Sequence, residues 1–61
     1  MKAKEMIRRI EDDGWKFARQ TGSHMHFKHP TKPGTVTVPF HGSRDLSKKV
    51  IASILKQAGL K

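Results

Sequence analysis

The segment 21–30, with the sequence TGSHMHFKHP, holds three of the chain's four histidines: His24, His26 and His29. Histidine exchanges a proton near neutral pH, because its ordinary pKa is about 6.5, and its neutral imidazole can bind a metal ion. Side chains alternate between the two faces of a β-strand, so His24, His26 and Lys28 would share one face of a strand here. The spacing therefore predicts two imidazoles and a cation on one surface, suited to proton transfer or to metal binding.

Metal binding is the weaker of these two interpretations. A His-x-His pair can supply two ligands, and His29 or His41 could add a third. Ligating histidines usually donate their second ring N–H to a carboxylate or carbonyl, and the nearest acids in sequence, Asp13 and Asp45, belong to other elements. The chain has no Cys and no HExxH pattern. We therefore expect no metal site and no cofactor.

Nucleophilic catalysis by a serine is also disfavoured. Ser23 and His24 are adjacent, so on a strand their side chains point to opposite faces, and Ser23 instead suits the turn. General acid–base catalysis on RNA fits better: a histidine removes the proton of a ribose 2′-OH, that oxygen attacks the neighbouring phosphorus, and Lys28 helps to hold the phosphate. DNA lacks the 2′-OH and would be spared. The residue types alone do not choose among the histidines.

Two amphipathic helices are predicted at the ends of the chain. The first begins near Ala3 and ends at Gly14, which can adopt the left-handed conformation common after a helix. The second has Ser47 as its N-cap and ends at Gly59. The apolar stripes that define them comprise Ala3, Met6, Ile7 and Ile10 in the first helix, and Leu46, Val50, Ile51, Ile54, Leu55 and Ala58 in the second.

Between the helices, three short runs at 15–20, 23–28 and 35–39 have the alternation of β-strands. Thr21-Gly22 and Pro33-Gly34 suit tight connections, so the strands should pair antiparallel. The sequence thus predicts one α+β domain spanning 1–61 in the order α-β-β-β-α, with both helices packed on one face of a three-stranded sheet. Met25, Phe27 and Trp15 would belong to the core and His29 to a loop. The face with His24 and His26 would stay open.

Charge indicates the kind of partner. Thirteen Lys and Arg against five Asp and Glu give a net charge of +8 and a pI near 10.5. Such an excess in so small a domain favours a polyanionic partner, and nucleic acid is the leading candidate. The absence of Cys suits a cytoplasmic location, and the N-terminus lacks the apolar core of a signal peptide. No apolar run is long enough to span a membrane, so we expect no membrane partner.

Five short motifs, in order along the chain, resemble the HicA toxin family: GW at 14–15, GSHxxF at 22–27, KHP at 28–30, VPFH at 38–41 and ILKQAGL at 54–60. The resemblance covers essentially the whole chain. It implies a fold like that of a double-stranded-RNA-binding domain, which agrees with the predicted order of elements. It also implies the toxin of a type II toxin–antitoxin system: an mRNA interferase, metal-independent, that cleaves mRNA and arrests translation and growth until a HicB-type antitoxin blocks it.

In that family the essential histidine lies in the GSH motif, which implies that His24 is the catalytic general base. The residues predicted to bind RNA with it are Ser23, His26, Lys28, Lys48 and Lys49. The two lysines open the last helix, where family members often carry a Gly-Thr pair, and resemble the phosphate-binding lysines of double-stranded-RNA-binding domains. Two questions stay open: whether His26 or His41 acts as a general acid, and whether the chain is instead a non-catalytic module that binds double-stranded RNA.

Overall fold

The computed structural model describes residues 1–42 and 44–60 and contains the predicted order of elements. They are α1 (Ala3–Asp12), β1 (Lys16–Thr21), β2 (His24–Lys28), β3 (Val36–Pro39) and α2 (Lys48–Gln57). The α-β-β-β-α prediction is therefore confirmed, and each observed strand begins and ends within one residue of its predicted limits. Among the described residues, no helix is long and apolar enough to cross a membrane.

The sheet has the order β1-β2-β3, and both pairs of strands are antiparallel. Gly22 and Ser23 form the turn between β1 and β2, and the φ of 58° at Gly22 is a left-handed value that glycine adopts at low cost. In β2, His24, Met25, His26 and Phe27 pair in turn with the four residues of β3, from Pro39 back to Val36. This register places the central strand between two partners along most of its length.

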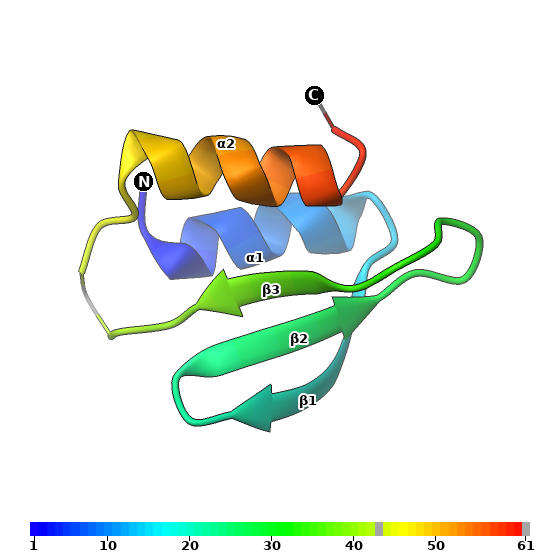
Figure 1. The fold of residues 1–61 in the computed structure, drawn as a ribbon, viewed down its shortest axis with the longest axis horizontal. Coiled ribbons are helices and arrows are strands. Elements are labelled where there is room, and N and C mark those ends of the chain that lie inside the picture. Colours follow the sequence, from blue (N-terminus) through cyan, green and yellow to red (C-terminus); the bar gives the residue numbers. More distant parts are fainter. Residues whose placement is uncertain (43, 61) are drawn as a thin grey trace.

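Both helices pack on the same face of the sheet (Figure 1). Phe27, Val36 and Val38 point from the sheet into the core, where they meet apolar side chains of both helices. The buried residues contributed by the helices and their ends are Ala3, Met6, Ile10, Trp15, Ile54 and Ala58. Met25 is only partly buried and packs against this core, so its predicted direction is correct. Neither helix of the described residues, 1–42 and 44–60, packs on the opposite face of the sheet.

Trp15 confirms the prediction of a core residue, since it is 1% exposed and lies just before β1. Its Nε1–H donates to the carbonyl oxygen of Ala58 at the end of α2, over 3.2 Å. This bond satisfies both a buried indole N–H and one of the carbonyl groups that a helix end leaves unpaired. Trp15 therefore joins the end of α2 to the start of the sheet.

The start of α2 also follows the prediction. The Oγ of Ser47 accepts a hydrogen bond from the backbone N–H of Val50 at 3.2 Å, so Ser47 is the N-cap. Gly59 follows the last turn with a φ of 71°. The N-terminus is held near this helix, because the N–H of Leu46 donates to the carbonyl of Met1 at 2.8 Å. This last contact ties the segment before α2 to the residues before α1, and Figure 1 shows both helices on one side of the sheet.

Candidate functional site

The sheet face opposite the helices is rich in basic and polar side chains. The pairing of β1, β2 and β3 determines which residues share it, because side chains of one face stand opposite one another across the strands. We call this surface the open face; its residues are Lys16, Arg19, Thr21, His24, His26, Lys28, Thr37 and Pro39. The prediction that His24, His26 and Lys28 share one side of the sheet is correct.

His24 is the exposed histidine of the open face. It is the first residue of β2, and its cross-strand neighbours are Thr21 on one side and Pro39 on the other. The preceding residue, Ser23, belongs to the turn, and its carbonyl oxygen accepts the N–H of Phe40 at 2.6 Å. Ser23 thus holds the end of β3 beside His24 through its backbone. The imidazole of His24 is left accessible to a ligand from solvent.

Arg19 is a site residue that the sequence analysis missed. A bulge at Ala18 shifts the register of β1 by one residue, so that Arg19 stands opposite His26 on the open face. Strict alternation from Phe17 would instead have turned Arg19 toward the core. The Nη1 of Arg19 donates to the Oγ1 of Thr21 over 3.1 Å, and Thr21 is the direct neighbour of His24. The guanidinium therefore lies along the strand toward His24.

His26 has a different environment from His24. It is partly buried, its Nδ1 lies 3.1 Å from the Oγ1 of Thr37, and its Nε2 is buried with no hydrogen-bond partner among the described residues. Burial lowers the pKa of His26 below its ordinary value, and the positive charges of Arg19 and His24 lower that pKa further. The lowered pKa favours the neutral form of His26, and its contact with Thr37 fixes the ring between the strands.

His29 has a structural role outside the open face. Its Nε2 lies 2.7 Å from the carbonyl oxygen of Asp13, and its Nδ1 accepts the backbone N–H groups of Thr31 and Lys32 at 3.1 and 3.0 Å. Since Nδ1 accepts, Nε2 carries the proton and donates. The side chain is 8% exposed, and its ring packs edge-on against Trp15. The expectation that His29 belongs to the loop structure is confirmed.

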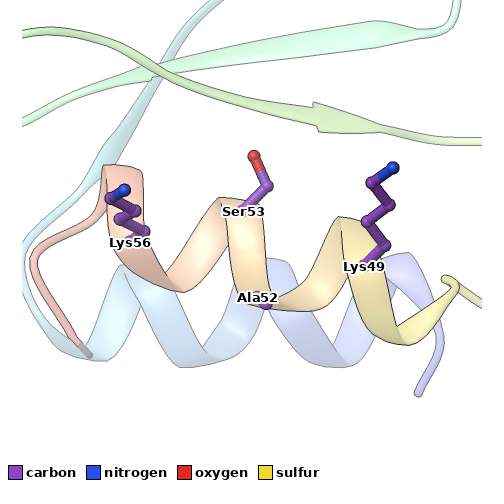
Figure 2. Close-up of a pocket in the computed structure, with 4 residues that line it drawn as sticks. All are labelled: Lys49, Ala52, Ser53 and Lys56. Carbon is purple, nitrogen blue, oxygen red and sulfur yellow. The ribbon is translucent and has the colours of Figure 1, made fainter.

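The predicted RNA-binding lysines of α2 lie on a separate, helical surface. Lys48 and Lys49 are exposed and open the helix. Lys49 borders a shallow hollow with Ala52, Ser53 and Lys56, which follow one another along one side of α2 (Figure 2). Lys56 was not predicted from the sequence. Its position two turns from Lys49, about 10 Å along the helix axis, places a cation at either end of the hollow.

Hydrogen bonds connect this hollow to the open face across the edge of the sheet. The N–H of Thr37 donates to the Oε1 of Gln57 at 3.1 Å, and the Nε2 of Gln57 donates to the Oγ of Ser53 at 3.2 Å. Thr37 is also the partner of His26. A polar path therefore runs from the open face over β3 to the lysines of α2.

His41 lies just beyond β3 and is exposed. With Pro39, Arg44 and residues at the start of α2, it borders a second hollow. The open face and this hollow thus meet at Pro39, the neighbour of His24. Arg44 is a further cation there that the sequence analysis did not identify.

A metal site has no structural support in the residues that the structure describes. Within 1–42 and 44–60, no three His, Cys, Asp or Glu side chains are grouped so that they could hold a metal ion. The chemistry that the open face offers is that of an accessible imidazole, with Arg19 close to it and Lys28 further along the same strand as His24. Such a surface can bind an anionic group and move a proton.

Comparisons with known proteins agree in family and in fold. A family model described as "HicA toxin of bacterial toxin-antitoxin" matches residues 3–60. A protein of Pseudomonas fluorescens (strain Pf0-1) named "Probable mRNA interferase HicA" is 36% identical over 61 residues, which cover 100% of this chain and 98% of that protein. A solved structure titled "Toxin-Antitoxin complex from Streptococcus pneumoniae" contains a chain with a TM-score of 0.80 and 34% identity, at 98% coverage of both chains. This chain belongs to the HicA toxin family.

Proposed function

We propose that this chain is the toxin of a toxin–antitoxin pair and that it acts in the cytoplasm as an mRNA interferase, with His24 as the general base. The observation that carries the proposal is the position of His24: an exposed imidazole on a basic sheet face, opposite Thr21, which holds the guanidinium of Arg19. The family assignment and the name of the Pseudomonas relative support the same activity.

The proposed reaction uses the 2′-OH of the RNA as its internal nucleophile. His24 takes the proton of this hydroxyl, the oxygen attacks the adjacent phosphorus, and the bond to the 5′-oxygen breaks. The products are a 2′,3′-cyclic phosphate and a 5′-hydroxyl end. Arg19 would stabilise the negative charge that develops on the phosphoryl oxygens, since a guanidinium can donate two parallel hydrogen bonds to a phosphate.

Binding of the RNA chain would extend beyond the open face. Lys28 and Lys16 are cross-strand neighbours at the far end of that face from His24, and the polar path through Thr37 leads to Lys49 and Lys56 on α2. These cations would contact phosphates and release counterions, so affinity should fall steeply with salt. Lys48, Ser23 and His26 remain predicted contacts.

We further propose that a HicB-type antitoxin binds and inhibits the chain. The similar Streptococcus chain comes from a toxin–antitoxin complex, which supports a protein partner. The net charge of +8 would favour an inhibitor with an acidic surface, because opposite charges accelerate association and a cover over the open face would exclude RNA.

Controlled expression in bacteria tests the toxin assignment. The wild-type chain should arrest growth and reduce translation, and His24→Ala should relieve both effects while retaining the circular dichroism spectrum and thermal melting of a folded protein. Salt-dependent RNA binding by purified His24→Ala should persist. If His24→Ala arrests growth as strongly as the wild type, the role of His24 is wrong. If neither protein affects growth or cleaves RNA but both bind it, the chain is a non-catalytic RNA-binding module.

A further inference from the structure

We propose that His41 is a second catalytic residue, which donates a proton to the leaving 5′-oxygen of the RNA. This inference rests on the proposed function, because it assigns the acid that accompanies the base His24. Cleavage by 2′-OH attack produces a poor leaving group, an alkoxide, unless a proton reaches it as the bond to phosphorus breaks. A second imidazole beside His24 would meet that need.

The strand register brings His41 near His24. His24 stands opposite Pro39, and the bond from the N–H of Phe40 to the carbonyl of Ser23, at 2.6 Å, continues this pairing one residue past β3. Phe40 packs against the core, as Val38 does, so alternation places Pro39 and His41 together on the opposite side. Both residues border one hollow near the start of α2, which places Pro39 and His41 close together at the end of β3.

The separation suits two groups acting on one phosphate. A residue diagonal to its neighbour across an antiparallel pair has its Cβ roughly 7–8 Å away. His41 follows Pro39, the partner of His24, by two residues, and continuing the pairing past β3 through Phe40 gives it this diagonal relation to His24. Two imidazoles at that distance can reach opposite sides of a phosphodiester without contacting each other. Both side chains are exposed, so RNA has access to each of them.

The other histidines are unsuited to the role of acid. The Nε2 of His26 is buried, its Nδ1 is engaged by Thr37, and its environment disfavours the protonated form that an acid requires. His29 uses both ring nitrogens in the loop after β2. His41 is the remaining histidine of the four, and its ring makes no hydrogen bond to any residue within 1–42 and 44–60.

The proposed step balances without any added reactant. Neutral His24 gains the 2′-OH proton, the 2′-oxygen forms a bond to phosphorus, the bond from phosphorus to the 5′-oxygen breaks, and protonated His41 gives its proton to that oxygen. The enzyme ends with His24 protonated and His41 neutral. Exchange with water restores both before the next turnover.

A substrate with a better leaving group tests this role directly. After a cleavage site is mapped in an RNA oligonucleotide, the same oligonucleotide is made with a bridging sulfur in place of the 5′-oxygen at that site. A thiolate leaves without protonation, so an acid becomes unnecessary. We expect His41→Ala to cleave the ordinary RNA about 100-fold more slowly than wild type, and the sulfur-containing RNA at close to the wild-type rate.

The variants His24→Ala and His26→Gln complete the experiment. His24→Ala should stay slow on both substrates, because attack by the 2′-oxygen still needs a base. Any defect of His26→Gln should be equal on both substrates. The inference is overturned if His41→Ala is equally slow on both, or if it cleaves ordinary RNA at the wild-type rate. Wild-type rates for His24→Ala on ordinary RNA would instead overturn the proposed function.

Discussion

His26 on β2 and Thr37 on β3 are cross-strand neighbours whose side chains are joined, with Nδ1 and Oγ1 3.1 Å apart. The same threonine is held from the other side by Gln57 of α2, through its backbone N–H. His26 is thereby fixed in the middle of the sheet, while His24, two residues earlier, remains exposed. Two histidines on one face of one strand therefore have different roles available to them.

The fixed position of His26 predicts its titration. By NMR, its imidazole should titrate below 6.5, since burial and the charges of Arg19 and His24 disfavour the protonated form. Arg19→Gln should raise the pKa of His26 by removing one of those charges. Because the unfolded chain takes up the proton first, the free energy of unfolding should fall as pH decreases through 6.5. In His26→Gln this part of the pH dependence should be missing; a His26 pKa at or above 6.5 would contradict the assignment.

The ion pair between Asp13 and Lys32 predicts a second pH effect. The Nζ of Lys32 lies 2.5 Å from the Oδ2 of Asp13 and 3.0 Å from the carbonyl oxygen of Ala58, so it links the ends of both helices. The hydrogen bond from Lys32 holds the pKa of Asp13 below its ordinary 3.8. The carboxylate therefore stabilises the fold above that pH, and the contribution is lost as pH falls through the lowered value.

Urea unfolding of Asp13→Asn measures this contribution. The urea midpoint of the variant should be lower than that of wild type at neutral pH. The difference should vanish well below pH 3.8, where Asp13 of the wild type is protonated and therefore uncharged, like the amide that replaces it. Asp12→Asn, at the exposed neighbouring position, is the matched control and should change the midpoint little. Equal effects of the two substitutions would show that net charge, rather than the contact with Lys32, is responsible.

The close approach of Gly14 to His29 predicts how much stability is lost when a methyl group is added at position 14. Gly14 has a φ of 110°, and a Cβ there would lie 2.7 Å from the Nε2 of His29. Gly22 also has a positive φ, 58°, but a Cβ there would meet no atom within 4 Å. Thermal unfolding should therefore show a loss of about 1 kcal/mol for Gly22→Ala and at least about 2 kcal/mol for Gly14→Ala. Equal losses of stability in Gly14→Ala and Gly22→Ala would mean that His29 leaves room for a side chain at position 14.

The bulge at Ala18 predicts a requirement for Arg19 in RNA cleavage. Arg19→Gln should slow cleavage about 10-fold or more while leaving the fold intact, because the lost cation stands next to Thr21 and His24. Lys56→Gln, by contrast, should mainly weaken RNA binding. The negative slope of log binding constant against log salt concentration should become less steep by about one. Single-turnover rates and salt titrations of both variants distinguish these roles. An Arg19→Gln variant with the wild-type cleavage rate would contradict the position assigned to Arg19.

The fold was predictable from the sequence because each element has a periodic apolar pattern and a recognisable end. The stripe from Ala3 to Ile10, the alternation around Phe27 and the cap at Ser47 each depend on residues close together in the chain. Packing then allows one arrangement of two amphipathic helices on a sheet with one apolar face. The residue alternation in β2 also predicted correctly which side of the sheet His24 and His26 occupy.

The finer features of the site depend on contacts between distant segments. No residue type marks Ala18 as a bulge, so the sequence did not predict that the side chain of Arg19 lies on the open face. The burial of His26 requires its neighbours on β1 and β3, and the role of Lys56 requires the geometry of α2 beside the sheet. The assignment of His24 as the base came from the resemblance of its GSH motif to that of the HicA family. Strand alternation alone places His24 and His26 on the same face and cannot distinguish between them.

Cleavage of purified mRNA in the presence of EDTA tests the role of His24 most directly. The rate and the chemistry of the new ends should be compared for wild type, His24→Ala and His26→Gln, with folding checked by circular dichroism. We predict cleavage by wild type with 2′,3′-cyclic phosphate and 5′-hydroxyl ends, and a loss of at least about 100-fold in His24→Ala. Cleavage by His24→Ala at the wild-type rate, or products with 3′-hydroxyl and 5′-phosphate ends, would contradict the assignment of His24 as the general base.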